Sequence, residues 1–510
     1  MRLRPPTPDE MKALADSLHL TMTADELEEY RTLVTENLAA YAAVDAMVEP
    51  KPEVKYPRTP GRRPEPGENP HNAWYMKTDI RGKDTGILAG RRVALKDTIC
   101  VAGVPMGAGT AVMDGFVPDV DATVVTRILD AGGTIAGKAV TEGFSFGGAG
   151  HNSATGPVRN PRDPSRSSGG SSNGSAALVA AREVDMAIGG DQGGSVRLPA
   201  SWCGVCGMKP TRGVVPYTGA IPMDPTLDHL GPMANSAREV ALLLEAVAGP
   251  DGLDPRQSDF TPDAYSETLT GTVEGLRIGV LEEGFAYEGI SQPDVDQAVR
   301  DAAQHFATLG AVVEPVSVPA HRDGQAILVA LAIEGAYATL VLGNGMGHGW
   351  SGFYNSHLLE YFSRAMPRRA NDLSPSAKSF LFLGGHIHNS YHGKYYAKAQ
   401  NLRRSFTEAY DEVFRQVDLL LLPATPMKAT ELPPDDCGPV ESVHRSFEMF
   451  VGTGGQFNIT GMPAITVPCA VSEGLPVGLA LAGRGFEDGR VLNAAHAFEE
   501  STDWTKRSPS

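Results

Sequence analysis

The stretch Val184-Asp-Met-Ala-Ile-Gly-Gly-Asp-Gln-Gly-Gly-Ser-Val-Arg197 decides the fold prediction. Its first five residues have the apolar character of a buried strand, and the glycines that follow end that strand. A serine at a strand end lies where α/β folds commonly carry catalytic groups. Glycine neighbours let a substrate approach closely and leave backbone N–H groups free to donate to it. Ser195 is therefore a candidate catalytic residue.

A second segment rich in Gly and Ser, Ser168-Gly-Gly-Ser-Ser-Asn-Gly-Ser175, precedes this strand in the sequence. The compact, Ala-rich residues 175–182 predict a helix after it, and residues 159–174 are expected to form a loop. The N-terminus of a helix favours developing negative charge. Most segments of this composition are only loops. Two of them, separated by one helix and one strand, indicate a shared site.

Further strands and helices alternate on both sides of this region. Four short apolar runs are strand candidates, and Lys96 directly follows the first of them: 93–95, 134–136, 276–281 and 418–422. Between the first two runs, Asp121 is placed to cap a helix that runs to about Asp130. This alternation predicts an α/β body in which helices cover a large sheet.

The N-terminal part of the chain has a different pattern. Thr7-Pro-Asp-Glu10 and Thr23-Ala-Asp-Glu26 both have the form of a capping box, which predicts two helices. Apolar residues after the second box recur at helical spacing: Leu27, Tyr30, Val34, Leu38, Tyr41 and Val44. Residues 50–71 are rich in proline and predict an extended linker. We therefore expect an α-helical extension and linker over residues 1–80 and a catalytic domain over residues 81–510.

Composition and charge limit the possible partners. The chain has 510 residues, of which 42% are hydrophobic, and a formal net charge of −17. This charge argues against nucleic acid and against an acidic membrane surface as partners. No stretch approaches the roughly 18 apolar residues of a membrane span, and the first residues lack the apolar core of a secretion signal. Five cysteines are too few for a disulfide framework. We expect a cytoplasmic protein.

The motifs of the chain, taken together, resemble those of the amidase signature family. The matching segments occur in the family's order: 93–97, 169–172, 191–195, 203–211, 422–426, 458–463 and 474–478. The likeness is greatest to bacterial enantioselective amidases associated with nitrile hydratases, which share the helical extension and the Gln of the Asp191-Gln-Gly-Gly-Ser195 run. The resemblance implies a large twisted mixed sheet covered by helices.

The resemblance also assigns catalytic roles. Ser195 matches the nucleophile, Lys96 matches the base, and Ser171 matches a bridging serine whose peptide bond is usually cis in this family. The backbone N–H groups of Gln192, Gly193, Gly194 and Ser195 match the oxyanion hole. The residues alone would not have selected Lys96, because Lys138 and Lys209 lie in comparable Gly-rich surroundings.

Four further residues are expected to support this site. Ser172 lies beside the triad and is expected to form hydrogen bonds within it. Asp191 and Arg197 flank the nucleophile, and we expect them to pair and brace the loop rather than to contact substrate. Phe146 falls where family members place an apolar pocket residue, although packing in the core is an equal alternative. Segments 325–365 and 440–460 are expected to supply pocket walls.

The implied chemistry is hydrolysis of a carboxamide through an acyl-enzyme, with no metal or organic cofactor. Neutral Lys96 would accept a proton from Ser171 while Ser171 takes one from Ser195, since burial lowers the pKa of a lysine. The same relay would cleave a carbamate (urethane), anilide, hydrazide or ester. Further alternatives are a non-catalytic binding module and a tRNA-dependent amidotransferase subunit. The expected partners are a small-molecule amide and a second copy of the chain, because the extension of similar enzymes contributes to dimer contacts.

Two other clusters could in principle bind a metal. Cys203-Gly-Val-Cys206 has a C-x-x-C form, but no second pair lies at useful spacing, and the family segment is structural. His386, His388 and His392 form the second cluster. On a strand, His386 and His388 would share a face as metal ligands do. A role at the edge of the substrate pocket is the alternative that we prefer.

Overall fold

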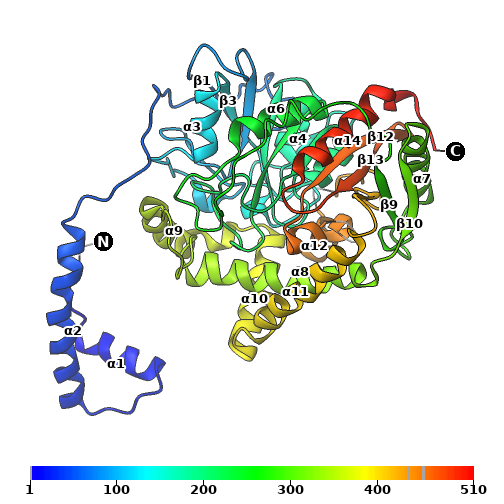
Figure 1. Cartoon of the computed structure of the whole chain (residues 1–510). Coiled ribbons are helices and arrows are strands. Elements are labelled where there is room, and N and C mark those ends of the chain that lie inside the picture. The colour runs from blue at the N-terminus through cyan, green and yellow to red at the C-terminus, as the bar shows by residue number, and fades with distance from the viewer. Residues whose placement is uncertain (1–2, 435, 451–453, 510) are drawn as a thin grey trace. The chain divides into compact units, whose positions relative to one another are not determined.

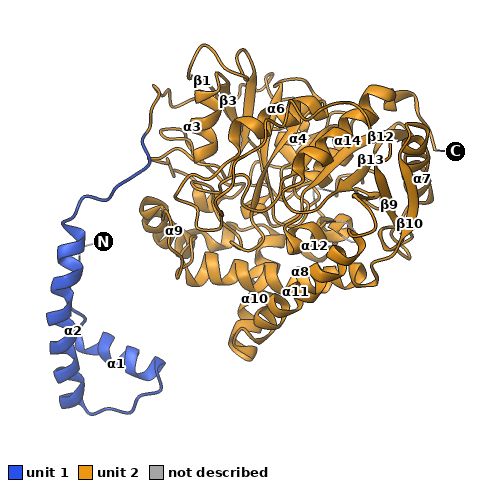
Figure 2. Cartoon of the chain, in the orientation of Figure 1, with its two compact units in different colours: residues 1–53 blue, residues 54–510 orange. Residues whose placement is uncertain are grey.

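The computed structural model describes residues 3–434, 436–450 and 454–509. The chain forms two compact units, residues 1–53 and 54–510 (Figure 2). The division lies within the segment predicted as extension and linker.

The first unit consists of two helices, α1 (Pro8–Ser17) and α2 (Ala24–Asp45). Both predicted capping boxes are present: Thr7 pairs with Glu10, and Thr23 pairs with Glu26. Helix α2 has no buried residue, and the apolar side chains predicted to share one of its faces are partly or fully exposed, as Tyr41 and Val44 are. The predicted helices are therefore confirmed, and their apolar stripe has no cover within the described residues of this unit.

The second unit contains an eleven-stranded mixed sheet with the order β1-β3-β2-β6-β8-β7-β12-β13-β11-β9-β10. Its strands are β1 (Trp74–Arg81), β2 (Arg92–Lys96), β3 (Thr134–Ala139), β6 (Met186–Asp191), β7 (Cys206–Lys209), β8 (His229–Ala234), β9 (Arg277–Leu281), β10 (Val312–Val316), β11 (Leu419–Pro423), β12 (Ala464–Ser472) and β13 (Leu475–Ala482). Strand β2 pairs in parallel with β3 and β6, and β9 pairs in parallel with β11 and β10. The pairs β6-β8, β8-β7, β7-β12, β12-β13 and β13-β11 are antiparallel. The predicted α/β fold with a large mixed sheet is confirmed.

The remaining helices pack on this sheet or on one another. They are α3 (Thr123–Asp130), α4 (Asn173–Ala180), α5 (Arg197–Cys203), α6 (Ala237–Val247), α7 (Pro293–Thr308), α8 (Gly324–Ala336), α9 (Ser356–Arg369), α10 (Pro375–Tyr391), α11 (Lys394–Val413), α12 (Pro439–Phe447), α13 (Gln456–Thr460) and α14 (Asp488–Ser501). Figure 1 shows α8, α10, α11 and α12 gathered in the lower part of the second unit. Helix α8 contacts α10 and α11 within this group and α13 outside it.

Several local predictions differ from the structure. Asp121 does not cap α3: the helix follows Ala122 without a side-chain cap, and Asp121 instead accepts a hydrogen bond from Ala102 N. The predicted loop contains a small separate sheet of β4 (Arg159–Asn160) and β5 (Asp163–Ser167). Local sequence patterns carry little information in both cases. Asp121 contacts a residue distant in the sequence, and β4 and β5 form within an irregular segment.

The proline-rich linker is extended, but all of it from Val54 onward belongs to the second unit. Tyr56 donates a hydrogen bond of 2.6 Å to Asp130, and Arg62 pairs with Lys77 as an isolated bridge. The segment is therefore fixed to the body from Val54 onward.

One helical segment corrects the prediction about membrane spans. Residues Pro319–Leu342 are long and apolar enough to cross a bilayer, and an 18-residue window within them has a mean hydropathy of 1.8. More than half of that window is buried inside the protein, and a core helix of a soluble protein has the same properties. Helix α8 is mostly apolar because other helices and a cavity lie against it.

Candidate active site

Lys96 lies at the end of strand β2, between the parallel neighbours β3 and β6. Its side chain is fully buried because the whole strand from Val93 onward is covered. The Nζ atom lies 2.6 Å from Ser171 Oγ and 3.2 Å from the carbonyl oxygen of Gly190. The structure therefore brings together two of the three predicted triad residues.

Burial determines the ionisation of Lys96. Loss of solvent lowers the pKa of Lys96 to about 7, although negative charges on Asp191, Glu142 and Asp228 oppose the shift. A free lysine has a pKa of about 10.4 and is almost entirely charged at neutral pH. Lys96 is therefore uncharged in a large fraction of molecules near pH 7, and an uncharged amine can accept a proton.

Ser171 and Ser172 lie on the loop before α4. The Gly170–Ser171 peptide bond is cis, as the family resemblance implied, and Thr141 donates to the Ser171 carbonyl at 2.9 Å. The Ser172 hydroxyl donates to Gly190 O at 3.0 Å and accepts from Gly190 N at 3.1 Å. Ser172 thus ties this loop to the end of β6, and among the described residues its hydroxyl bonds to Gly190 rather than to the triad side chains.

Ser195 lies on the loop between β6, which ends at Asp191, and α5, which begins at Arg197. It is 3% exposed and lines a cavity of about 210 Å³. Its carbonyl oxygen accepts a hydrogen bond of 3.2 Å from Ser172 N, so the two loops rich in Gly and Ser lie side by side. This arrangement places the predicted nucleophile beside the predicted relay.

Asp191 and Arg197 brace the nucleophile loop, as predicted. Arg197 Nε lies 3.1 Å from an Asp191 carboxylate oxygen, and the same carboxylate accepts from Gly194 N at 2.7 Å and from Val196 N at 3.1 Å. Burial alone would raise the pKa of Asp191, but the adjacent Arg197 lowers it well below its usual range. The carboxylate is therefore ionised and fixes the loop from inside.

The predicted oxyanion donors divide into two groups. Among the described residues, the backbone N–H groups of Gln192, Gly193 and Ser195 have no protein acceptor and could donate to a substrate. Gly194 departs from the prediction because its N–H already donates to Asp191. Its φ of 112° explains why a glycine stands there.

Asn458 is a supporting residue whose role could not be deduced from its motif. Its side chain donates to the Asp191 carbonyl at 2.9 Å and accepts from Arg197 at 2.8 Å. Arg197 also donates to Gly454 O at 2.6 Å. The only sequence signal was that the segment beginning at Asn458 belongs to the family resemblance.

The cavity beside Ser195 is mainly apolar. Its lining residues are Ser145, Gly147, Gln192, Gly193, Ser195, Met223, Gln325, Leu328, Val329, Ala332, Ile333, Ser379, Phe380, Val443, Phe447 and Phe450. The expected wall segments 325–365 and 440–460 both contribute, through α8 and through residues 443–450, while residues 451–453 lie outside the described residues. Helix α10 contributes Ser379 and Phe380, which the sequence analysis did not identify.

Phe146 does not line this cavity, which corrects one half of its prediction. Its ring is buried and stacks on Phe380, with ring centroids 4.6 Å apart and an interplanar angle of 25°. Its neighbours Ser145 and Gly147 face the cavity instead. Phe146 therefore supports the pocket wall from behind.

The two possible metal clusters have other arrangements. His386 and His388 lie on helix α10 rather than on a strand, so they do not share a face, and His392 follows the end of that helix. Cys203 contacts Ser168 O, whereas Cys206 contacts Glu499. The described residues contain no group of three or more His, Cys, Asp or Glu placed to hold a metal ion.

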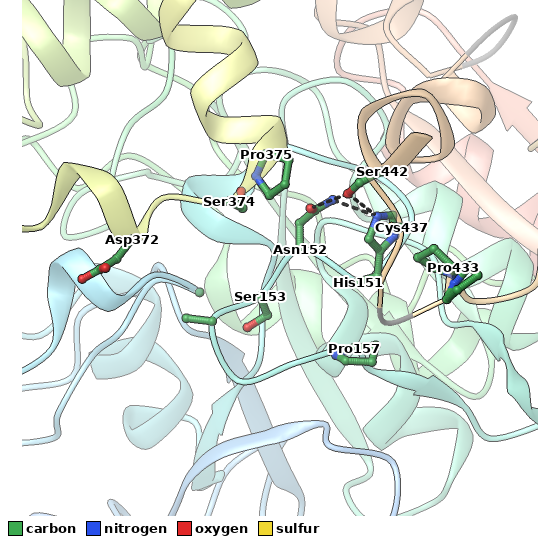
Figure 3. A pocket seen from close by; sticks show the side chains of 13 residues that line it. His151, Asn152, Ser153, Pro157, Asp372, Ser374, Pro375, Pro433, Cys437 and Ser442 are labelled. Atoms are coloured by element: carbon green, nitrogen blue, oxygen red, sulfur yellow. Dashed lines mark hydrogen bonds between the residues drawn. The ribbon is translucent and has the colours of Figure 1, made fainter. Parts of the chain in front are cut away.

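A second cavity of about 380 Å³ lies beside residues 151–157 and the start of α10 (Figure 3). His151 Nε2 lies 3.0 Å from Ser442 Oγ, and Asn152 Oδ1 accepts from Ser442 at 3.2 Å. This cavity is larger than the one at Ser195, but none of the predicted triad residues lines it. The candidate active site is therefore the smaller cavity.

Comparison with known proteins agrees with this geometry. The chain matches the family model described as Amidase over residues 68–492. It is 40% identical to an enantioselective amidase of Rhodococcus rhodochrous, over 98% of this chain and 96% of that protein. It is 37% identical to a subunit of the glutamyl-tRNA(Gln) amidotransferase of Methanosarcina mazei, over 85% of this chain and 89% of that protein. The solved structure of 6-aminohexanoate cyclic dimer hydrolase with its substrate matches with a TM-score of 0.73 and 26% identity, over 83% of this chain and 87% of that chain.

Proposed function

Because this chain belongs to the amidase family, a family of amide hydrolases, we propose that it hydrolyses a carboxamide through an acyl-enzyme formed on Ser195. One observation carries the proposal. Lys96, buried and with a pKa near 7, lies within hydrogen-bond distance of Ser171, and the Ser171 loop is bonded to the loop of Ser195.

In the first step, the Ser195 hydroxyl oxygen attacks the substrate carbonyl carbon. The Ser195 proton passes to Ser171, and the Ser171 proton passes to uncharged Lys96. Backbone N–H groups of Gln192, Gly193 and Ser195 can donate to the oxyanion that forms. Loss of one such donor typically costs about 3 kcal/mol of transition-state stabilisation.

In the second step, the proton returns through Ser171 to the leaving nitrogen. The C–N bond breaks, and ammonia or an amine departs. Water then attacks the acyl-enzyme, and the same relay accepts its proton before Ser195 is released with its hydroxyl restored. Every proton in this cycle is carried by Lys96, Ser171 and Ser195, so the mechanism draws on side chains of this chain alone.

The cavity supports an uncharged, apolar acyl group. None of its described lining side chains is charged, and the rings of Phe380, Phe447 and Phe450 stand among them. An apolar cavity cannot compensate a buried charge on a substrate. Aromatic and branched aliphatic amides are therefore the substrates we propose.

The same absence of charged lining side chains among the described residues weighs against the amidotransferase alternative. Glutamine carries both an ammonium and a carboxylate group, which would need charged partners in the site. The similarity to amidotransferase subunits keeps this alternative testable. Release of glutamate from glutamine at a rate comparable to that for an aromatic amide would favour it.

The second alternative changes only the bond. The relay would also serve a carbamate, anilide, hydrazide or ester, since each presents a carbonyl carbon to the same serine. The name of the Rhodococcus relative, an enantioselective amidase, favours the amide.

We also propose that the chain acts as a homodimer. The exposed apolar side chains of α2 support this proposal, because contiguous apolar surface is typical of association sites. The measurement that tests it is the molar mass in solution.

The bond assignment is tested by product release from four substrates that share one aromatic acyl or alkyl group: a primary carboxamide, an anilide, a carbamate and an ester. Wild type and Ser195→Ala are assayed side by side. We expect the primary amide to be cleaved fastest and Ser195→Ala to be inactive. A faster carbamate or ester would correct the bond assignment, and full activity of Ser195→Ala on every substrate would refute the nucleophile.

A further inference from the structure

Glu142 is a buried carboxylate beside the bridging serine, and the mechanism above gives it no role. It is fully buried, at the start of a short 3-10 turn that follows β3. Its backbone N–H donates to the Ser171 carbonyl at 3.3 Å, next to the hydrogen bond from Thr141 to the same oxygen. Glu142 therefore holds the Ser171 peptide through its main chain.

The Glu142 side chain supports the same segment. A methyl group added at Gly170 would lie 3.2 Å from Glu142 Cγ, and one added at Gly147 would lie 3.0 Å from Oε2. Two glycines thus allow the carboxylate to pack tightly. Asn152 N donates to Oε2 at 3.0 Å, whereas Oε1 is buried and has no hydrogen-bond partner among the described residues.

A carboxylate in the protein interior is costly, so its retention here needs a reason. Burial raises the pKa of Glu142 to about 7, while the surrounding backbone N–H groups and Lys96 lower it. In return, Glu142 raises the pKa of Lys96. The two side chains therefore titrate in the same pH range and influence each other.

We propose that Glu142 is a positioning residue of the relay, which holds the Gly170–Ser171 segment and keeps a negative charge near Lys96. This inference rests on the function proposed above. Glu142 does not touch the reacting atoms in the proposal. Its main chain holds Ser171, and its negative charge stabilises the protonated form of Lys96.

Two other carboxylates also face Lys96, and they must be separated from Glu142. Asp191 is paired with Arg197, so it stays ionised throughout the neutral range. Burial raises the pKa of Asp228 to about 7, and the positive charge of Arg256 opposes this shift. Substitution of Glu142 alone leaves both of these charges in place.

The expected effect has a definite sign. Only uncharged Lys96 accepts a proton, so kcat/KM rises as pH increases through the pKa of Lys96. Removal of the Glu142 charge removes an interaction that favours charged Lys96. The acid limb of the profile then moves to lower pH, by about half a pH unit to one pH unit for a neighbouring charge of this kind.

The experiment compares pH profiles of kcat and kcat/KM for wild type, Glu142→Gln and Glu142→Asp on the best amide of the panel. Gln keeps the volume and the acceptor for Asn152 N but removes the charge. We expect Glu142→Gln to shift the acid limb downward with little change in KM. Asp keeps the charge, but its shorter side chain supports the Gly170–Ser171 segment less well. We therefore expect Glu142→Asp to have a lower kcat at every pH with an unshifted acid limb.

Glu499→Gln is the matched control. Glu499 is also largely buried with a pKa raised to about 7, and it accepts from the backbone N–H of Ala237, but it is not among the charges that act on Lys96. Its substitution should leave the profile unchanged. Melting temperatures and circular dichroism of all variants check that each is folded.

The outcomes separate this inference from the proposed function. If Ser195→Ala is inactive but Glu142→Gln keeps the wild-type acid limb, the role of Glu142 is wrong and the proposed function stands. If Ser195→Ala remains active, the proposed function fails. If Glu142→Gln does not fold, Glu142→Asp decides: a shifted acid limb in that variant, which retains the charge, refutes the inference.

Discussion

Lys96 acts as a base only in its uncharged form, and this makes activity depend on pH. Since burial lowers the pKa of Lys96 to about 7, we expect kcat/KM to rise between about pH 6 and pH 8. Glu142 and Asp228 titrate in the same range, so the measured midpoint belongs to the cluster as a whole. The measurement is a pH profile at substrate concentrations below KM, and a flat profile from pH 5 to pH 8 would contradict the prediction.

Replacement of Lys96 tests the same chemistry in another way. Lys96→Met removes the proton acceptor, and we expect kcat to fall by about 10²- to 10⁴-fold at all pH values. Because the substitution is apolar and the site is buried, folding should be preserved. Unchanged thermal unfolding together with lost activity is the expected pair of results.

Arg197 is predicted to matter for stability. Arg197→Met leaves the Asp191 carboxylate buried without its ion-pair partner, and breaking a buried pair in this way costs about 3–5 kcal/mol. Urea denaturation measures the difference. Arg415→Met is the control, because its ion pair with Glu412 is exposed and such pairs contribute about 0–1 kcal/mol. Equal losses for the two variants would show that the bracing role is wrong.

Single residues also show what the sequence could reveal about the site. Lys96 and Ser171 entered the prediction through a family motif, and the structure places their side chains in contact. Glu142 carried no signal, because its neighbours Thr141 and Gly143 indicate only a loop. Phe146 was expected in the pocket, but the direction of an aromatic side chain depends on its tertiary partner, here Phe380.

At the level of secondary-structure elements, predictability followed the range of the interactions. The capping boxes of α1 and α2 involve residues three apart, and both were predictable. Helix α10 was not recognised, although Ser374 accepts from Ala377 N and Pro375 follows it as a start signal. The prediction for the histidines near the end of α10 did not take this start signal into account, because the signal lies more than ten residues before them.

Helix α10 also carries a prediction about substrate size. Phe380→Ala removes a ring that lines the cavity and stacks on Phe146. We expect kcat/KM to fall about tenfold for a small aromatic amide, since lost apolar contact in a pocket is worth about 1–3 kcal/mol, and to fall less or to rise for a bulkier one. Phe382→Ala on the same helix is the control, because that side chain is 77% exposed. A similar effect of both substitutions would argue against Phe380 as a pocket wall.

On the scale of the whole molecule, all of the candidate catalytic residues belong to one of the two units. Deletion of residues 1–53 should therefore leave the pH profile and kcat of the remaining unit close to those of the full chain. If the extension supports the proposed dimer, the deletion should halve the molar mass found by light scattering. A large loss of kcat in a folded monomer would show that the extension contributes to the site.

The two functions of the site, chemistry and selection, come from different parts of the chain. Lys96, Ser171 and Ser195 lie at strand ends and on loops tied to the sheet, whereas most of the pocket wall lies on helices α8, α10 and α12. Substitutions in those helices can alter which acyl groups fit without disturbing the hydrogen bonds of the relay. Such an architecture is favourable to evolvability: new substrate ranges can arise by gradual drift of the helical wall, while the inherited reaction persists.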